Sequence, residues 1–505
     1  MGFDFRAIYQ AYLACRRRKR NTRNAQRYEI HLLDYLVNTQ QRLQKRCWQP
    51  ARSVCFVTSG TKPREIHAAS FVDRVVHHLV VPPLEKLFEP IFIHDSYANR
   101  KNKGTHKAIE RLQLFMRQIT LNQTRPAYYL QLDISNFFNS IDKRILYRLL
   151  QNRLGKAVKN NQLPNEKGLL LRDLCKTLLL NDTAHHAIQQ GNPNRFAKVP
   201  PHKRLSNAPK GVGLPIGDLT SQFFANVYLN QLDQFVKHQL KCRHYCRYVD
   251  DFILLHEDEK QLIQWRDDIE NFLSEQLNLK LRDSGILKQV STGADFLGYI
   301  VRPHYRLVRR RVIDNLKQRL QHFQKRLVKK HQKGEMLELS RHDTQKLRAT
   351  LASYLGHFKH ANSWRLQQSL WKRYPFLNSV FQLDKFATIN AVNESPESDS
   401  FYQQWRYFKQ RYPQGILLIQ TGNHVETYND DALQLKQVGY ALNKTARIHF
   451  GQTISIPLKS FKALRRSLRR NAIAHSFVAE QGYQKKLKHR VLRFQWQPNN
   501  QQYQL

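Results

Sequence analysis

Two adjacent aspartates interrupt an apolar run near the middle of the chain, Arg247-Tyr248-Val249-Asp250-Asp251-Phe252-Ile253-Leu254-Leu255. The aromatic and β-branched residues on either side favour two short strands that meet at a tight turn. Burying two carboxylates together is costly unless cations neutralise them. The pair is therefore a candidate site for divalent metal ions, although an Asp-Asp surface turn is the simpler interpretation of this segment taken alone.

A third aspartate stands in a second apolar strand, Leu130-Gln131-Leu132-Asp133-Ile134, which continues into Ser135-Asn136-Phe137-Phe138 and a helix. Asp133, Asp250 and Asp251 together could hold two Mg²⁺ ions about 4 Å apart. One ion would lower the pKa of a primer 3′-hydroxyl, and the other would hold a triphosphate and the leaving pyrophosphate. Such a site would perform in-line phosphoryl transfer, in which the protein supplies mainly position and charge.

The charge of the chain indicates a polyanionic partner. Its 505 residues include 83 Lys and Arg against 39 Asp and Glu, which gives a net charge of +44. A charge this large repels itself unless nucleic acid binds it for much of the time. No membrane partner is expected, because the basic residues are spread over the whole length and no apolar run reaches about 18 residues.

A reducing cytosol is the expected compartment. Residues 1–34 are too polar and basic for a secretory signal, and six scattered cysteines do not suggest a disulfide framework. Cys242 and Cys246, with His244 between them, could bind zinc, but their spacing lacks a second pair of ligands.

Composition predicts five segments. Residues 1–60 are expected to be a helical extension, and residues 61–300 alternate short apolar strands with helices, which indicates an α+β fold. Residues 301–385 are expected to be helical and basic, 386–400 to be a polar linker, and 401–505 to mix strands with basic helices.

Between the two carboxylate segments lies a turn followed by a helix, Gly213-Leu214-Pro215-Ile216-Gly217-Asp218-Leu219-Thr220-Ser221-Gln222. Asp218 or Thr220 could cap the helix, and a glycine in the turn would let the backbone approach a base pair closely. An ordinary entry from a loop into a helix fits the same residues.

Seven motifs in this order resemble those of the reverse transcriptases. They are Pro63–Ile66, Phe71–Val76, Ser96–Arg100, the Asp133 strand, the Pro215–Gln222 turn, Tyr248–Asp251 and Phe296–Tyr299. The resemblance covers about residues 10–380. It implies a right-hand polymerase: fingers and palm over 61–300, with an antiparallel sheet in the palm, and a helical thumb over 301–385. It also implies RNA-directed DNA polymerase activity with dNTPs and two Mg²⁺ ions.

Carried over residue by residue, the resemblance makes Asp133, Asp250 and Asp251 the catalytic residues and metal ligands. Phe138 would lie beneath the sugar and reject a 2′-hydroxyl, although Phe137 and Phe138 could both be core. The full nucleotide-binding set would be Lys62, Arg64, Arg74, Phe138, Pro215, Ile216, Gly217 and Gln222. The cations expected along an RNA–DNA hybrid, read by backbone and shape, are Arg100, Lys103, Arg309, Arg310, Lys325, Arg326, Lys329 and Lys330. Arg74 and Arg100 could instead pair with acidic neighbours.

Ile216 stands where many reverse transcriptases have Gln. With Ile66–Ala69, His94–Tyr97, Lys103–His106 and Ser353–His357, it resembles the enzymes of diversity-generating retroelements. Those enzymes copy a template-repeat RNA and misincorporate opposite adenines. Losing a hydrogen-bonding side chain beside the nascent pair weakens discrimination, so error-prone cDNA synthesis is expected. The implied partners are a noncoding template RNA and a small basic accessory protein, in a bacterial cytoplasm.

Ser284 is the second departure, because the family usually has a lysine near this position that can protonate pyrophosphate. Lys280, Arg282 and Lys288 are the candidates to replace it, and the sequence does not choose among them.

Residues 401–505 resemble, more weakly, the N-terminal mismatch-recognition domain of the MutS proteins, which implies a small C-terminal α/β domain of the MutS-I type. His424 stands where that family has a wedging Phe, and Glu426 where a Glu bonds the base. An imidazole stacks less well than a phenyl ring and so offsets less of the cost of unstacking. Binding of RNA or a protein partner is therefore expected in place of mismatch reading.

Three alternatives remain open. A defence-associated bacterial reverse transcriptase that copies a dedicated noncoding RNA would use the same residues. A group II intron maturase would carry an endonuclease module after the thumb, which is not recognisable here. A catalytically inactive RNA-binding scaffold would not need all three aspartates.

Overall fold

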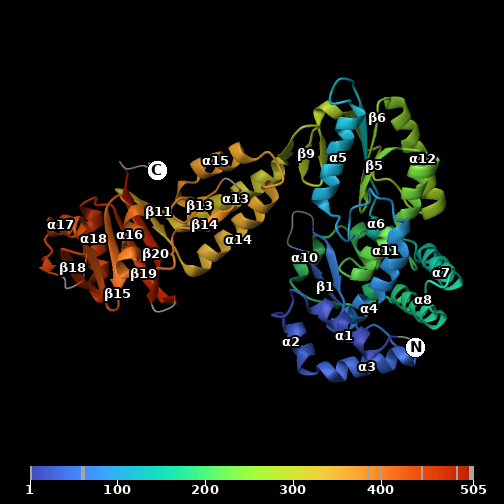
Figure 1. The fold of residues 1–505 in the computed structure, drawn as a ribbon, viewed down its shortest axis with the longest axis horizontal. Coiled ribbons are helices and arrows are strands. Elements are labelled where there is room, and N and C mark those ends of the chain that lie inside the picture. Colours follow the sequence, from blue (N-terminus) through green and yellow to red (C-terminus); the bar gives the residue numbers. More distant parts are fainter. Residues whose placement is uncertain are drawn as a thin grey trace. The chain divides into compact units, whose positions relative to one another are not determined.

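The computed structural model describes residues 3–58, 63–384, 387–398, 400–444, 447, 449–484 and 487–499. The chain divides into two compact units (Figure 1). The N-terminal unit comprises Met1–Leu297 and Val301–His304, and the C-terminal unit comprises Gly298–Ile300 and Tyr305–Leu505. No helix in the described ranges is long and apolar enough to cross a membrane.

A four-stranded antiparallel sheet is the centre of the N-terminal unit. Its strands follow the order β5 (His244–Tyr248), β6 (Asp251–His256), β3 (Tyr128–Asp133) and β7 (Ile286–Gln289). Helices α5 (Thr105–Ile119) and α12 (Glu259–Leu277) flank β5 and β6 (Figure 1). Because helices cover this sheet, β6 is buried at four consecutive positions, which explains its unbroken apolar run.

Helices α4 (Phe71–Phe88) and α11 (Leu219–Gln234) pack against each other in the same core as the sheet. The helical start of the chain was predicted. It consists of α1 (Phe5–Arg16), α2 (Arg23–Ile30) and α3 (Leu32–Gln44), of which α1 and α2 pack on α4. The Asp4 and Thr22 side chains cap α1 and α2 by accepting backbone N–H groups.

A short hairpin precedes α4. Strand β1 (Val54–Val57) pairs antiparallel with β2 (Glu65–Ala68) and parallel with β4 (Ile188–Gln189). Short 3-10 and π-helical turns aside, the remaining described helices and strands up to residue 301 are α6 (Phe137–Ser140), α7 (Lys143–Lys159), α8 (Asn165–Leu180), α9 (Thr183–His186), α10 (Pro193–Ala197), β8 (Ala294–Phe296) and β9 (Tyr299–Val301).

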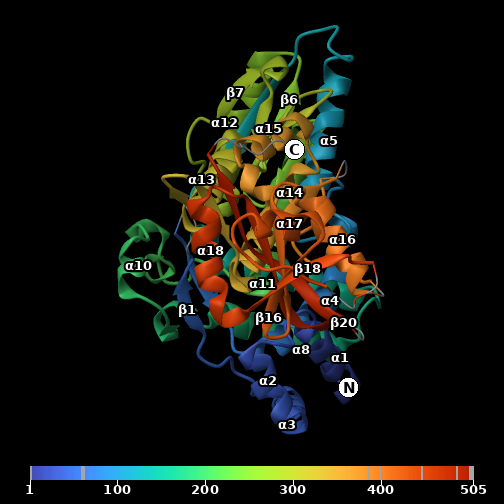
Figure 2. The same cartoon turned by 90° about the vertical axis from the view of Figure 1, so that its left-hand side faces the viewer.

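The C-terminal unit contains a sheet of eight strands. Its order is β11 (Val328–His331), β12 (Gly334–Glu338), β20 (Leu487–Pro498), β19 (His475–Gln484), β15 (Ile416–Thr421), β16 (His424–Tyr428), β18 (Gln452–Pro457) and β17 (Asn443–Lys444). Of these strands, β16, β18 and β20 are labelled in Figure 2. Because side chains alternate along β15, Ile416 and Leu418 join the core under α17 (Asp430–Lys436) and α18 (Phe461–Arg470). Leu417 and Ile419 join the core on the other face, with α16 (Phe401–Arg411).

The basic helices of residues 301–385 belong to this second core. They are α13 (Arg310–Leu327), α14 (Arg341–Phe358) and α15 (Trp364–Arg373), accompanied by β10 (Arg306–Val308), β13 (Phe381–Leu383) and β14 (Ile389–Ala391). Composition places these residues and 386–505 in separate segments. The described part of 386–400 contains β14 and buried side chains, and β12 pairs with β20, so 305–505 form one compact unit. The separate thumb, linker and C-terminal domain stay predictions.

Candidate active site

The fold brings Asp133 and Asp251 to directly opposite positions of the central sheet. Asp133 is the last residue of β3 and Asp251 the first of β6, and the two are partners in the register of these strands. Tyr248 pairs with Asp251 across the hairpin of β5 and β6, so Val249 and Asp250 form its two-residue turn. Val249 has a φ of +57°, a left-handed conformation that strains a β-branched residue.

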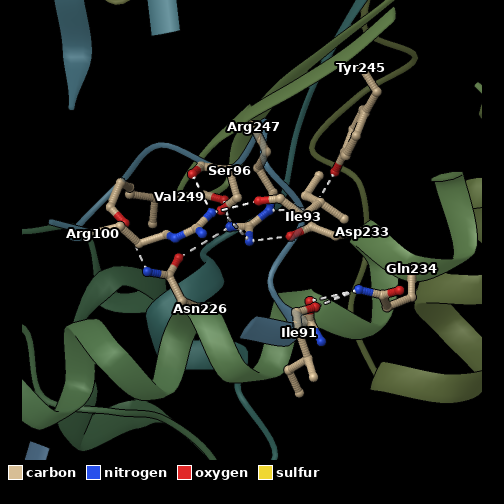
Figure 3. A network of polar contacts seen from close by, with 12 residues as sticks. Ile91, Ile93, Ser96, Arg100, Asn226, Asp233, Gln234, Tyr245, Arg247 and Val249 are labelled. Atoms are coloured by element: carbon tan, nitrogen blue, oxygen red, sulfur yellow. Dashed lines mark hydrogen bonds and ion pairs between the residues drawn. The ribbon is translucent and has the colours of Figure 1, made fainter. Parts of the chain in front are cut away.

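A buried ion pair next to this turn stabilises its backbone (Figure 3). Arg247 of β5 and Asp233 of α11 have side chains that are 1% and 0% exposed and approach to 2.6 Å. The same guanidinium donates hydrogen bonds to the carbonyl of Val249 at 2.9 Å and to the hydroxyl of Ser96 at 3.0 Å. Charge-assisted hydrogen bonds therefore fix the backbone that carries the aspartate pair.

Burial and crowding raise the pKa of both hairpin aspartates. For Asp250, burial is the main cause and the Asp133 carboxylate the next, and the pKa rises to about 6. For Asp251, burial again acts first, and the carboxylates of Asp133, Asp250 and Asp295 help to raise the pKa to about 7, against a 3.0 Å hydrogen bond from Gln131. Carboxylates held this close favour bound cations, and their oxygens suit Mg²⁺.

Arg282 contacts Asp133, the third aspartate of the site. Its side chain forms an ion pair with Asp133, and its backbone N–H donates to the Asp133 carbonyl at 2.9 Å. The Arg282 side chain is 52% exposed, so it has room to move away when a cation binds. Three basic residues were considered as replacements for the lysine expected near Ser284, and Arg282 is the one whose side chain contacts an aspartate. Lys288 lies in β7, and the backbone carbonyl of Lys280 accepts the Ser135 N–H.

The Pro215–Gln222 segment packs its turn against β2. The Ile216 carbonyl accepts the His67 N–H at 2.8 Å. Gly217 has a φ of +132°, and a Cβ there would lie 2.6 Å from the His67 carbonyl oxygen, so a side chain is excluded. Asp218 occupies the N-cap position of α11, but its side chain makes no capping hydrogen bond and instead accepts the Ala69 N–H at 3.3 Å. Burial raises the pKa of Asp218 to about 6. The half-buried residues of this segment that were predicted to meet a nucleotide are Pro215, Ile216 and Gln222.

Arg64 is a predicted triphosphate ligand that lies near the aspartates. It directly precedes β2, and its charge lowers the pKa of Asp250 against the effect of burial. Lys62, its predicted companion, falls outside the described residues. Arg74 lies on α4 instead. Its charge lowers the pKa of Asp218 and so opposes part of the larger rise that burial causes.

Phe137 and Phe138 have different environments. Phe137 is 2% exposed in the main core, while Phe138 is half-buried and meets Phe137 edge-on at a centroid distance of 5.4 Å. The Phe138 carbonyl accepts the Leu214 N–H at 2.7 Å. This bond joins the end of the Asp133 segment to the residue before the Pro215 turn.

Two basic residues predicted to contact nucleic acid are engaged within the protein. The guanidinium of Arg100 donates to Glu89 and to the carbonyls of Ile93 and Ser96, and its side chain is 6% exposed. These contacts favour the structural alternative for Arg100. Lys103 donates to the carbonyl of His94 at 2.8 Å.

The cations of the C-terminal unit are mostly exposed and several have acidic neighbours. Arg326 pairs with Asp343, Lys329 with Glu338, and Lys330 lies 3.6 Å from Glu335. The exposed members of the predicted set are Arg310, Lys325, Arg326, Lys329 and Lys330, whereas Arg309 is half-buried.

His424 and Glu426 lie on one strand with opposite environments. His424 begins β16 directly after the Gly422–Asn423 turn and is exposed. Glu426 is half-buried, accepts the Tyr428 hydroxyl and lies 3.4 Å from Arg447. Protein contacts therefore already engage the glutamate.

The sequence alone did not predict that Asp233 and Gln131 contribute to the candidate active site. Asp233 is a charged residue inside the almost wholly buried helix α11, and such a charge demands a partner. Gln131 stands two residues before Asp133 in an apolar strand, hence on the same face of the sheet. These two signals are visible in the sequence, but their partners are not.

Comparison with known proteins identifies the N-terminal unit. Residues 58–301 match the family model described as reverse transcriptase (RNA-dependent DNA polymerase). The chain contains a reverse transcriptase domain. This domain is an RNA-directed DNA polymerase, and it holds the three aspartates.

The curated relatives are distant. Protein YkfC of Escherichia coli (strain K12) is 24% identical over 304 residues, which is 53% of this chain and 71% of YkfC. The group II intron-encoded protein LtrA of Lactococcus lactis subsp. cremoris is 22% identical over 290 residues, or 50% of this chain. The match spans 47% of LtrA, about half its length.

Solved telomerase structures are similar over part of the chain. Apo telomerase from Candida tropicalis, truncated from the C-terminal domain, matches with a TM-score of 0.37 and 10% identity, over 55% of this chain and 60% of that one. Telomerase from Candida albicans in complex with a fragment of telomeric RNA matches with a TM-score of 0.36 and 12% identity, over 66% and 57%.

Proposed function

We propose that this protein synthesises cDNA on an RNA template by phosphoryl transfer at Asp133, Asp250 and Asp251. The observation that carries the proposal is the pairing of Asp133 with Asp251, beside Asp250, inside a reverse transcriptase domain. Two Mg²⁺ ions bound by these carboxylates would activate the primer 3′-hydroxyl and neutralise the triphosphate. The chain itself supplies the rigid hairpin and the buried negative charge.

Two arginines near the aspartates suit the triphosphate. Arg64 acts electrostatically on Asp250, and Arg282 pairs with Asp133. A guanidinium at each place can neutralise phosphate oxygens, and release of Arg282 from Asp133 would free both for the nucleotide. Lys62 would assist Arg64, and half-buried Phe138 would exclude a ribose 2′-hydroxyl.

Low fidelity is the expected consequence of Ile216. An isoleucine side chain cannot donate or accept the hydrogen bonds that a glutamine would offer to the nascent pair. The backbone of this turn is held against β2 by the bond to His67, and Gly217 keeps the approach open. The backbone of the turn is fixed, but its side chain offers no hydrogen bond to the nascent pair. This combination supports a diversity-generating enzyme that miscopies adenines of a template-repeat RNA in a bacterial cytoplasm.

Exposed cations of α13 and β11 would contact the backbone of an RNA–DNA hybrid, since such contacts need charge but no base reading. The C-terminal strands and α18 would bind RNA or a small basic accessory protein as a MutS-I-like module. Exposed His424 is available for stacking on a base, while Glu426 stabilises its own strand through Tyr428. The second candidate function, antiphage defence with a dedicated noncoding RNA, uses the same active site.

Sequencing of the cDNA made on the RNA encoded beside this gene, with dNTPs and Mg²⁺, distinguishes the two functions. Errors concentrated at template adenines, and reduced about tenfold by Ile216→Gln, would support the mutagenic enzyme. Faithful or repetitive cDNA would overturn it in favour of the defence enzyme. Leu219→Gln, a change of another aliphatic residue three positions along, should leave the error spectrum unchanged.

A further inference from the structure

Three side chains with metal-binding chemistry share one face of the β1–β2 hairpin. Cys55 and His67 are direct partners in the antiparallel register, and Val57 pairs with Glu65. Cross-strand partners share a face, and so do residues two apart on one strand. Cys55, His67 and Glu65 therefore point to the same side of the hairpin and form a cluster made of other residues than the three aspartates of the active site.

The ligand atoms lie at nearly the spacing that a tetrahedral zinc ion needs. Cys55 Sγ is 3.8 Å from His67 Nε2, which is 3.8 Å from Glu65 Oε2, and all three ligand atoms fit within 4.8 Å. A tetrahedral ion with Zn–S of about 2.3 Å and Zn–N or Zn–O of about 2.0–2.1 Å places its ligand atoms about 3.4–3.6 Å apart. The two distances to His67 need to shorten by a few tenths of an ångström, and the one between Cys55 and Glu65 by up to about 1 Å.

Burial makes this cluster costly without a cation. Cys55 and His67 are 4% and 3% exposed, and the Glu65 side chain is 10% exposed. Among the residues that the structure describes, no lysine or arginine forms an ion pair with Glu65, and the imidazole of His67 is the close side chain, with Nε2 3.8 Å from Glu65 Oε2. A buried carboxylate in such surroundings needs a positive charge.

The cluster also has an outer hydrogen bond of the kind that orients a metal ligand. The backbone N–H of Leu205 donates to Glu65 Oε2 at 3.1 Å. This is the same oxygen that lies 3.8 Å from His67 Nε2, so the bond fixes the carboxylate while the second lone pair of Oε2 stays available for coordination. The protein thus orients Glu65, whereas the buried His67 Nδ1 has no hydrogen-bond partner among the described residues.

We propose that Cys55, Glu65 and His67 bind a zinc ion. One thiolate, one imidazole and one carboxylate form a mixed ligand set that suits Zn²⁺ better than Mg²⁺, which prefers oxygen alone. The ion would tie β1 to β2. The backbone N–H of His67 is already bonded to the Ile216 carbonyl, and Arg64 directly precedes the same strand, so the ion would fix the hairpin beside the nucleotide turn.

Zinc content of the tag-free full-length protein tests the proposal, measured without template or nucleotide. We expect about one zinc per chain, and a thiolate-to-cobalt charge-transfer band when Co²⁺ replaces it. Cys55→Ser and His67→Asn should lose the metal and the band. Cys175→Ser is the matched control, because Cys175 is equally buried but lies in α8, away from the cluster.

Glu65→Gln keeps an oxygen that can accept the Leu205 N–H, so this variant is expected to stay folded. It therefore tests metal binding even if the Cys55 and His67 variants unfold. It should weaken Co²⁺ binding by at least ~10-fold while circular dichroism stays unchanged. Absence of zinc and of the cobalt band from the wild type would overturn the proposal, as would equal metal in wild type and Cys55→Ser. Either result leaves the polymerase assignment untouched, because no step of the assay requires nucleotide incorporation.

Discussion

At the scale of single residues, Asp250 and Asp251 couple the stability of the metal-free protein to pH. Their pKa values are raised from 3.8 to about 6 and about 7, so the folded state binds protons more tightly than the unfolded chain. Their protonated forms stabilise the fold fully below pH 4. This contribution is lost as the pH rises through 6 to 7.

Asp251→Asn should therefore be more stable than the wild type at pH 8 in metal-free buffer, by about 1–3 kcal/mol. The amide is neutral and its oxygen can still accept the hydrogen bond from Gln131. Urea unfolding at pH 5 and pH 8 measures the difference, which should shrink at the lower pH. Mg²⁺ should stabilise the wild type more than the variant, and a destabilised Asp251→Asn at pH 8 would contradict this account.

At the scale of elements, the β5–β6 hairpin depends on a residue of α11. Asp233 is fully buried and pairs with Arg247, which in turn holds the Val249 carbonyl. Asp233→Ala would leave the guanidinium buried without its carboxylate and should lower the free energy of unfolding by about 3–5 kcal/mol. Chemical denaturation measures this, with exposed Asp267→Ala of α12 as the control. A loss below about 1 kcal/mol would show that the pair does not hold the hairpin.

The strands and the hairpin turn could be predicted from the sequence because short-range patterns determine them. The run around Asp133 alternates apolar and polar residues, and the run after Asp250 is a short apolar stretch of the kind a buried strand has. The turn follows from the aspartate pair that interrupts the second run. Register is a long-range property, so the sequence could not show that Asp133 faces Asp251. For the same reason, Cys55 and His67 gave no metal signal until their strands were paired.

At the scale of the whole molecule, one sheet unites residues that the sequence assigned to different domains. β12 pairs with β20 along Gly334–Glu338, and its Leu337 belongs to the same core as α13 and α14. Composition indicated a break at 386–400 because polar residues without periodicity are typical of linkers. The structure buries Val392 and Asn393 there by contact with the C-terminal strands, as in the 2.7 Å bond from the Leu492 N–H to the Asn393 carbonyl.

A chain ending at residue 400 should consequently lose the fold of residues 305–400. Removal of β20 exposes the hydrogen-bonding edge of β12 and the apolar core beneath it. Limited proteolysis should cut within 305–400 at least ~10 times faster than in a chain ending at residue 499, while residues 1–297 stay resistant. Equal resistance of 305–400 in both chains would establish an independent thumb.

Primer extension on an RNA template tests the polymerase assignment most directly. With dNTPs and Mg²⁺, the wild type should extend the primer, and Asp250→Asn should reduce the rate by roughly 10³-fold or more, because a carboxylate that holds the metal ions is lost. Asp267→Asn, on the exposed face of α12, should extend like the wild type. Equal incorporation by the wild type and Asp250→Asn would contradict catalysis by the aspartates of this hairpin.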